Sequence, residues 1–265
     1  MRSGKSCRYL TIYEKTFFMT DRQQLKWSVV LPGIPVSSNR GALGWSSVTL
    51  IESENHRILV DTGSYGDRAL LLEKLGQKGF GPEDITMLFL THFHFDHVLN
   101  LDLFPKAALY LSEAERDYID QKDFLSVHDP FVPEPFYRFN VDRITSFSGE
   151  KCLVPGIRTI PLPGHTPGMT GLLLEQEKVL IAGDGIKNGY EFARDLPPPV
   201  FGSKRDALAS YRKARDIADI IVPGHDRPFR NRDGEVSAYL DHFFIEVRFV
   251  PDPWIPEKII TFSSR

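Results

Sequence analysis

The stretch THFHFDH at residues 91–97 directly follows an apolar run at residues 85–90. It places three of the chain's eight histidines and one aspartate within six positions. Imidazoles gain little by packing on one another, whereas imidazole and carboxylate groups are good ligands for a divalent metal ion. If the apolar run is a strand, His92 and His94 point to the same side where it ends, and the last two motif residues belong to the next turn. The stretch therefore predicts a metal site, and two adjacent ions fit it better than one.

Apolar runs and helical patterns alternate along the first half of the chain. Leucines at the helical period, followed by Gly76 and Gly79, indicate one helix, and Ser112 with Glu115 forms a capping box for another. The expected strands are residues 46–52, 56–60, 85–90 and 107–111, and the expected helices are residues 67–78 and 113–121. This order predicts an α/β fold in which helices cover a sheet.

Composition narrows the class of protein. A chain of 265 residues that is 42% hydrophobic can form one domain over residues 1–265. The net charge of -3 provides no basic field for nucleic acid, which makes a nucleic-acid partner unfavourable. Cys7 and Cys152 form no CxxC pair, which favours a reducing, cytoplasmic location. No apolar run reaches the ~18 residues that a membrane helix needs, so we expect no membrane association.

The second half repeats one design three times. Apolar runs at residues 157–162, 178–182 and 219–222 each end at a glycine turn, from which His165, Asp184 and His225 follow. One histidine after a strand is more often structural than a metal ligand, but a fourth occurrence of the same design makes coincidence improbable.

Asp61 ends a further apolar run, at residues 56–60. On residue types alone, two interpretations are equally compatible. The carboxylate can cap its own turn, or it can support a metal ligand through a hydrogen bond.

The HxHxDH set at residues 92–97, taken with His165, Asp184 and His225, resembles the metallo-β-lactamase-fold hydrolase superfamily. The resemblance implies an α/β fold of the αββα sandwich type, with two mixed β-sheets flanked by helices and a dinuclear site at one edge. It also implies a role for each ligand. His92, His94 and His165 would hold the first ion, Asp96, His97 and His225 the second, Asp184 would bridge the two, and Asp61 would support a ligand from behind.

Nitrogen and oxygen ligands without thiolate suit Zn²⁺, and Mn²⁺, Fe²⁺, Co²⁺ or Ni²⁺ can occupy such sites. Two adjacent ions lower the pKa of a shared water and polarise a carbonyl or phosphoryl oxygen. We therefore expect hydrolysis of an ester, lactone, thioester or phosphoester bond of a small-molecule substrate, with Asp96 orienting the hydroxide or carrying a proton.

Within the superfamily, the HxHFDH and PGHTPG segments are similar to the N-acyl homoserine lactonase and glyoxalase II-like branch. That resemblance implies a catalytic tyrosine after the bridging aspartate, for which Tyr190 is the candidate, with Lys187 or Asn188 as replacements and an idle solvated loop as the alternative. Leu99 stands where many of those enzymes have glycine, so their substrates do not transfer to this chain. Two alternative functions are a phosphodiesterase or ribonuclease of the same fold and a mononuclear-iron sulfur dioxygenase.

Two segments have no regular pattern that assigns them. Residues 123–142 mix aromatic residues with prolines, which predicts either a lid with an apolar underside or a loop fixed to the body by its aromatics. Residues 237–265 form a short apolar extension that is expected to pack on the body or on a second subunit of a homodimer.

Overall fold

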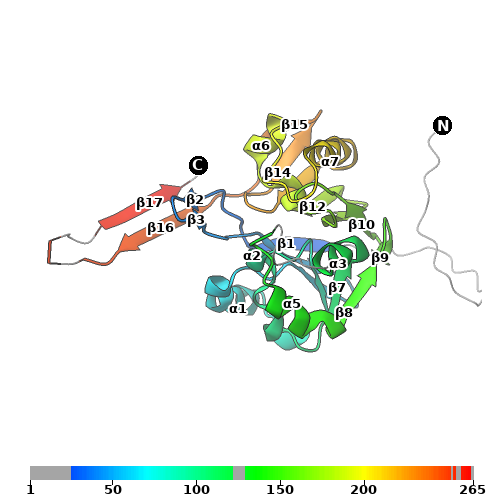
Figure 1. Cartoon of the computed structure of the whole chain (residues 1–265), viewed down its shortest axis with the longest axis horizontal. Coiled ribbons are helices and arrows are strands. Elements are labelled where there is room, and N and C mark those ends of the chain that lie inside the picture. The colour runs from blue at the N-terminus through cyan, green and yellow to red at the C-terminus, as the bar shows by residue number, and fades with distance from the viewer. Residues whose placement is uncertain (1–24, 122–128, 252, 255–257, 264–265) are drawn as a thin grey trace, which may run out of the picture.

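The computed structural model describes residues 25–121, 129–251, 253–254 and 258–263. Two β-sheets lie face to face, with helices α1 and α5 outside one sheet and helices α6 and α7 outside the other (Figure 1). The order of layers is therefore helix, sheet, sheet, helix, and the expected αββα sandwich is confirmed. Among the described residues, no helix is both long and apolar enough to cross a membrane.

The first sheet has six strands, of which β5 to β8 run parallel and β1, β4 and β5 antiparallel. In spatial order these are β1 (Lys26–Leu31), β4 (Val48–Glu52), β5 (Arg57–Val60), β6 (Met87–Phe89), β7 (Ala108–Ser112) and β8 (Ile144–Phe147). The helices of this half are α1 (Arg68–Gln77), α2 (Phe95–Val98), α3 (Glu113–Ile119) and α5 (Glu134–Asn140), with 3-10 turns η1 (Tyr65–Asp67), η2 (Pro82–Asp84), η3 (Leu101–Leu103) and η4 (Val141–Arg143).

The second sheet has seven strands, with β12 and β13 as its parallel pair. In spatial order these are β15 (Glu235–Tyr239), β14 (Phe229–Arg232), β13 (Ile220–Pro223), β12 (Val179–Gly183), β11 (Thr170–Leu174), β10 (Ile157–Pro161) and β9 (Cys152–Val154). Its remaining elements are η5 (Asp184–Ile186), α6 (Gly189–Ala193) and α7 (Lys204–Ile217). Two short ladders complete the described fold, β2 (Ser37–Ser38) with β3 (Gly41–Ala42) and β16 (Phe244–Phe249) with β17 (Lys258–Ser263).

Three apolar clusters hold these layers together, because strand residues alternate between the two faces of a sheet. On β5, Ile58 packs between the two sheets while Leu59 packs under the helices of the first half. On β12, Ile181 likewise joins the cluster between the sheets, and Leu180 packs toward α6 and α7. Each central strand is therefore buried on both faces, which explains its continuous apolar sequence.

Two sequence expectations need correction. Residues 123–142 showed no helical period, yet α5 forms within them, because a proline at the second position of a helix removes no intrahelical hydrogen bond. Ser112 does cap α3 by accepting a hydrogen bond from the backbone N–H of Glu115, but the Glu115 carboxylate binds the N–H of Phe93 instead of closing the capping box.

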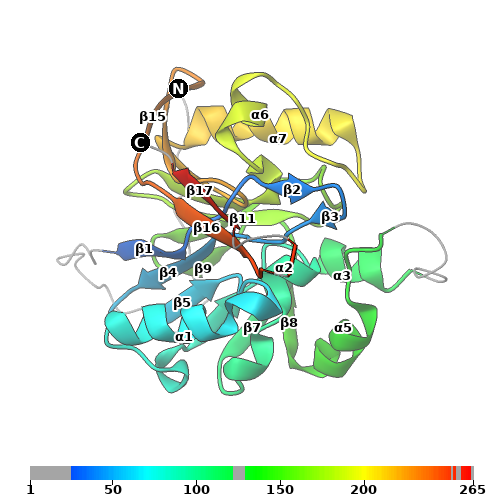
Figure 2. The ribbon, with the colours of Figure 1, turned by 90° about the vertical axis from the view of Figure 1, so that its left-hand side faces the viewer.

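The C-terminal extension divides into two parts. Strand β15 joins the edge of the second sheet, as expected of a segment that packs on the body. The β16–β17 hairpin instead projects from the body (Figure 1) and points toward the viewer in Figure 2. Packing on the body is therefore wrong for this part, and packing on a second subunit stays a prediction.

Candidate metal centre

The HxHxDH motif lies between β6 and α2, at the edge of the first sheet. The backbone remains extended through His94, which is the N-cap of α2, and Asp96 and His97 lie in the first turn of that helix. This puts the four candidate ligands of the motif at the carboxyl end of a parallel strand, the edge at which ligand sites of such sheets form.

The other three candidates emerge from the same edge of the second sheet. Asp184 follows β12 and His225 follows the parallel neighbour β13, with Gly224 directly before it. A Cβ atom on Gly224 would lie 2.0 Å from Asp184 Oδ1, so only glycine allows this close approach. His165 lies in the turn between β10 and β11. The backbone N–H of Ser47 donates to the carbonyl of Gly224 at 2.7 Å, which joins the two halves beside the site.

Two clusters of ligand atoms result. His92, His94 and His165 form the first, in which His94 Nδ1 and His165 Nε2 lie 3.0 Å apart. Asp96, His97 and His225 form the second, in which His225 Nε2 lies 3.2 Å from Asp96 Oδ2. The ligand atoms within each cluster all lie within 4.8 Å of one another, a spacing that one metal ion can bridge.

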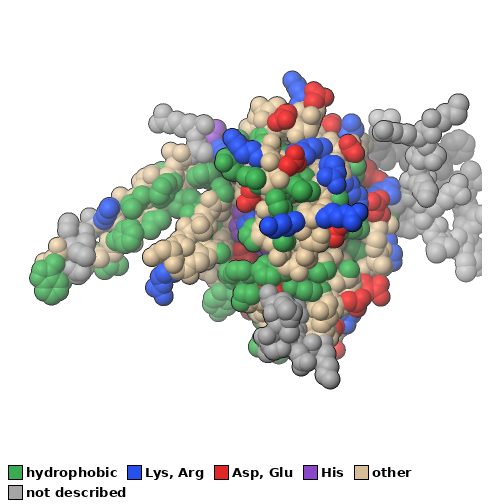
Figure 3. All heavy atoms as spheres, turned by 45° about the horizontal axis from the view of Figure 1, so that its top comes forward, with side chains coloured by type: hydrophobic (Ala, Val, Ile, Leu, Met, Phe, Trp, Pro, Cys, Tyr) green, Lys and Arg blue, Asp and Glu red, His purple; other side chains and the backbone are tan. Residues whose placement is uncertain are grey.

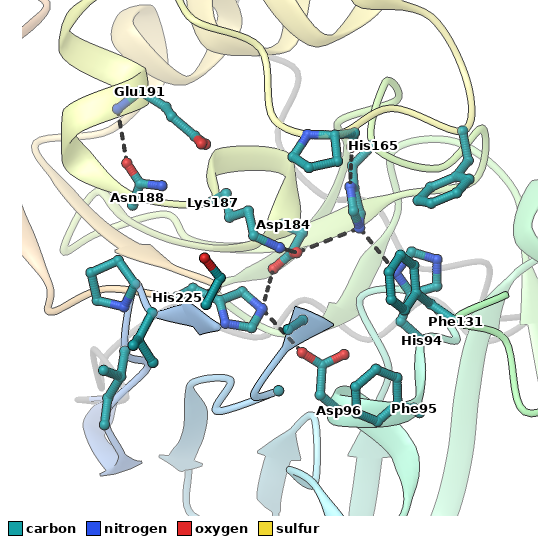
Figure 4. Close-up of a pocket in the computed structure, with 18 residues that line it drawn as sticks. His94, Phe95, Asp96, Phe131, His165, Asp184, Lys187, Asn188, Glu191 and His225 are labelled. Carbon is teal, nitrogen blue, oxygen red and sulfur yellow. Dashed lines mark hydrogen bonds and ion pairs between the residues drawn. The ribbon is translucent and has the colours of Figure 1, made fainter. Parts of the chain in front are cut away.

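Asp184 lies between the clusters and presents one oxygen to each (Figure 4). Its Oδ2 atom is 3.4 Å from His165 Nε2 in the first cluster. Its Oδ1 atom is 3.4 Å from His97 Nε2 and 3.3 Å from His225 Nε2 in the second. This is the arrangement expected of a carboxylate that bridges two ions.

Several of these atoms are buried without any hydrogen-bond partner. They are the Nε2 atoms of His92, His97 and His225 and the Oδ1 atom of Asp184. Buried polar groups in proteins nearly always have a partner, so four such atoms converging on one place require an explanation. Divalent cations satisfy all of them, and the nitrogen and oxygen donors fit zinc.

The opposite ring nitrogens are held by partners outside the clusters. His97 Nδ1 is 2.8 Å from Asp61 Oδ2, and His165 Nδ1 is 2.6 Å from the carbonyl of Pro199. His94 Nε2 is 2.8 Å from Asp129 Oδ2. Such contacts fix which nitrogen carries the proton and direct the other toward a metal ion.

Asp61 is held firmly in its place behind His97. Its carboxylate also accepts hydrogen bonds from the backbone N–H and the hydroxyl of Thr91, both at 2.8 Å. The backbone of Asp61 has a φ of 60°, a left-handed conformation that is uncommon outside glycine. Of the two interpretations of Asp61, the structure favours support of a ligand over a simple turn cap.

The two clusters line a cavity of about 320 Å³. Phe95 and Phe131 form an aromatic wall near His94 and Asp96, and Lys187, Asn188 and Glu191 form a polar wall near Asp184 (Figure 4). The ring of Phe201 extends the aromatic wall, because it contacts the rings of His94 and Phe131. Residues 34–37 and Ala42, at the β2–β3 ladder, contribute a third side.

Among the candidates after Asp184, the structure favours Lys187 over Tyr190. Lys187 Nζ lies 2.6 Å from Asp184 Oδ2 and faces the cavity. Tyr190 is 59% exposed, stacks on Arg194 with 4.0 Å between the guanidinium carbon and the ring centroid, and is not part of the cavity wall. The structure therefore places Tyr190 away from the cavity and makes Lys187 the better candidate, and a catalytic role for either residue stays a prediction.

Comparison with known proteins shows to which family the chain belongs. The sequence model of the Metallo-beta-lactamase superfamily matches residues 43–225, well over half of the chain. The chain belongs to this superfamily.

Relatives of this metallo-β-lactamase superfamily member include metallo-beta-lactamase domain-containing protein 1 of Mus musculus, 33% identical over 77% of this chain and 74% of that protein. An N-acyl homoserine lactonase of a Bacillus species is 26% identical over 67% of this chain and 79% of the lactonase. A solved structure from Thermotoga maritima has the same fold, with a TM-score of 0.63 at 24% identity over 78% of this chain and 99% of that chain. Superfamily membership and the lactonase relatives support a hydrolase.

In this metallo-β-lactamase fold, burial favours the neutral form of two histidines of the first cluster. Burial lowers the pKa of His92 well below its usual value, and the neighbouring imidazoles of His97 and His94 lower it further. Burial also lowers the pKa of His165 to about 3. Neutral imidazoles have a free lone pair, so these two rings need lose no proton to bind a cation.

The second cluster is more highly charged. Burial alone would lower the pKa of His97, but the carboxylates of Asp61 and Asp96 outweigh it and raise that pKa well above its usual value. Burial alone would also lower the pKa of His225, but the carboxylate of Asp184 acts in the opposite direction, and the pKa of His225 is raised as well. A cation at this cluster therefore replaces protons.

Two buried carboxylates were missed by the sequence analysis. Asp129 accepts hydrogen bonds from Tyr118 and from the backbone N–H of Phe131 as well as contacting His94. Glu115 joins the two halves of the chain, because it accepts from Phe93 in one half and from Thr166 and Gly168 in the other. Neither has a local sequence signal for these contacts. His128, next to Asp129, lies outside the described residues.

Proposed function

We propose that this protein is a dinuclear zinc hydrolase that cleaves an ester-type or lactone carbonyl in a small molecule. The observation that carries the proposal is the placement of Asp184, with one carboxylate oxygen toward each cluster at 3.3–3.4 Å from the histidines.

Each of the two clusters would bind one metal ion. His92, His94 and His165 would hold one ion, Asp96, His97 and His225 the other, and Asp184 both. When bound, two adjacent ions supply a water of lowered pKa and a Lewis acid for the carbonyl oxygen. Asp96 is buried beside the second cluster and is placed to take a proton from the attacking water and transfer it to the leaving oxygen.

Lys187 supplies positive charge on the polar wall. Burial would lower its pKa, but the contact with Asp184 raises it above the usual value, so the side chain is a cation. A fixed cation beside the reacting carbonyl stabilises the negative charge that develops on its oxygen in the transition state.

The cavity favours a small substrate with an apolar part. A volume of about 320 Å³ is at the lower end of the range for small-molecule pockets. The aromatic wall of Phe95, Phe131 and Phe201 suits an acyl chain, and the lactonase relatives support acyl lactones as the first compounds to test.

A phosphodiesterase of the same fold is the second candidate. Lys187 in the cavity wall favours it, because an ammonium group binds phosphate oxygens well. The net charge of -3 argues against long nucleic acids and favours a small phosphodiester.

The test is an activity panel on full-length protein whose metal content has been measured by mass spectrometry. The substrates are acyl homoserine lactones, aryl esters, thioesters and bis(p-nitrophenyl) phosphate. We expect two zinc ions per chain and turnover of a lactone or ester, lost in His97→Ala and kept in His56→Ala, a histidine outside the cavity wall. One iron per chain and no hydrolysis would overturn the proposal, and turnover of the phosphodiester alone would select the second candidate.

A further inference from the structure

The β16–β17 hairpin stands apart from the two sheets. Its strands pair in register from Phe244 opposite Ser263 to Phe249 opposite Lys258, and among the described residues they form a sheet of two strands on their own. It projects from the body in Figure 1 and points toward the viewer in Figure 2. A two-stranded hairpin in water is marginally stable at best, so this one needs a surface to pack against.

The register assigns its side chains to two faces, because residues directly opposite each other in a ladder share a face. The first face is almost wholly apolar and consists of Ile245, Val247, Phe249, Lys258, Ile260 and Phe262. The second face is mixed and consists of Phe244, Glu246, Arg248, Ile259, Thr261 and Ser263. Apolar side chains are therefore present on both faces, and aromatic rings lie on each.

The exposed apolar area of the hairpin is large. Phe244 is 68% exposed, Phe249 49% and Phe262 52%, and at the tip Val250 is 89% and Trp254 87% exposed. At about 200 Å² for an aromatic side chain, the four aromatic residues alone expose on the order of 500 Å². The aliphatic residues add to this area, which brings the hairpin close to the ~800 Å² that each partner buries in a standard interface.

A complementary surface lies on the body near the base of the hairpin. The β2–β3 ladder is on the same side of the molecule as β16 and β17 in Figures 1 and 2, and Val36 and Leu43 beside it are exposed. Hydrophobic side chains run along the projecting hairpin in Figure 3. Val36 also lines the cavity, so this body surface borders the opening of the metal centre.

We propose that the β16–β17 hairpin is a dimerisation arm, which packs on the β2–β3 side of a second copy of this chain while the second copy's arm packs on the first. Such an exchange is isologous and closes with two-fold symmetry. A membrane surface or the chain's own body would cover one face of the arm. A second copy would cover both faces of the arm, the first with its body and the second with its own arm. The docked arm would also place apolar side chains beside Val36 at the cavity.

The test is sedimentation velocity of the full chain across the micromolar range. The chain has a mass of 30.2 kDa, and we expect a dimer of twice that mass. The triple variant Phe244→Ser, Phe249→Ser, Phe262→Ser should sediment as a monomer with an unchanged circular dichroism spectrum and metal content, because these side chains are exposed. Phe139→Ser, which changes an exposed phenylalanine on α5, is the matched control and should remain a dimer.

A separate variant tests the docking surface on the β2–β3 side of the body. Leu43→Glu should weaken the dimer at least tenfold, whereas an unchanged dissociation constant would show that the arm does not dock there. A wild-type monomer at all concentrations, or a triple variant that remains a dimer, would overturn the proposal. Binding of a monomeric wild-type chain to phosphatidylcholine vesicles would assign the arm to membranes instead. These readouts depend on mass and not on hydrolysis, so they are independent of the proposed activity.

Discussion

His94 Nε2 donates a hydrogen bond of 2.8 Å to the carboxylate of Asp129, which lies 35 residues further along the chain. Burial alone would raise the pKa of Asp129, but His94, the backbone N–H of Phe131 and the hydroxyl of Tyr118 together outweigh it and hold that pKa below its usual value. The carboxylate is therefore an ionised acceptor, which keeps the proton on Nε2 and leaves Nδ1 free toward the first cluster. Asp129 thus helps to orient His94 in the metal centre.

Asp129→Asn should weaken metal binding at the first cluster by about 10- to 100-fold, the usual cost of losing such a partner. The amide keeps the shape of the carboxylate but lacks its charge. Competition with a chromogenic chelator measures the affinity. Asp142→Asn, an exposed neighbour in sequence, serves as the control, and equal affinities in the two variants would refute the role of Asp129.

Asp184→Asn should weaken both metal sites together, whereas His225→Ala should empty mainly the second. The reason is that Asp184 presents one oxygen to each cluster and His225 belongs to one. Metal equivalents per chain, measured after dialysis, give the result. Two full equivalents in both variants would show that the ligand assignment is wrong.

Metal binding at the second cluster should depend more steeply on pH than binding at the first. The raised pKa values of His97 and His225 favour the protonated rings in the metal-free protein, and an ion bound at the second cluster must displace those protons. The lowered pKa values of His92 and His165 mean that these two rings of the first cluster lose no proton when an ion binds. Affinity at the second cluster should therefore fall as pH drops from about 8 to about 6, while the first changes little. Calorimetric titration at several pH values measures both metal affinities. An equal loss of affinity at the two clusters as the pH drops would contradict the prediction.

Lys187→Met should lower kcat by about 100-fold and leave the metal content unchanged, because the cation at the cavity wall stabilises charge in the transition state without belonging to either cluster. Steady-state kinetics on the best substrate of the panel provide the measurement. Tyr190→Phe should have wild-type kinetics, since that ring lies outside the cavity wall. The reverse pattern would restore Tyr190 as the candidate.

Glu115→Ala should lower the free energy of unfolding by about 3 kcal/mol, because it leaves buried donors of Phe93, Thr166 and Gly168 without an acceptor. Urea denaturation measures the loss. Glu113→Ala lies on the same helix but is exposed, and it should change stability by less than about 0.5 kcal/mol. Similar losses in both variants would indicate an effect on the helix and not on the buried carboxylate.

The sequence predicted the residues whose signal is local. A short apolar run, a glycine turn and a metal-binding side chain recur before His165, Asp184 and His225, and the structure brings these residues together with residues 92–97. The alternation of strands and helices predicted an α/β fold, and the family resemblance implied the sandwich. That the clusters bind two zinc ions stays a prediction.

Contacts between distant segments were not predictable in this way. Glu115 matches a capping box, so a local explanation concealed its contacts with the second half of the chain. Asp129 has no repeated pattern around it, and its contact with His94 depends on how the folded chain brings the two residues together. Tyr190 was misplaced because α6 begins at Gly189 and turns that ring toward Arg194 and solvent.

The seven candidate ligands are contributed by loops of both sheets, with His92, His94, Asp96 and His97 from one half of the chain and His165, Asp184 and His225 from the other. Ions bound there would act as cross-links between the two halves of the sandwich. A ligand that binds only the folded state at 100 times its dissociation constant adds about 2.7 kcal/mol to stability. We infer that metal availability in the cell would determine how much of this protein survives proteolysis, so that starvation for zinc would reduce its abundance as well as its turnover.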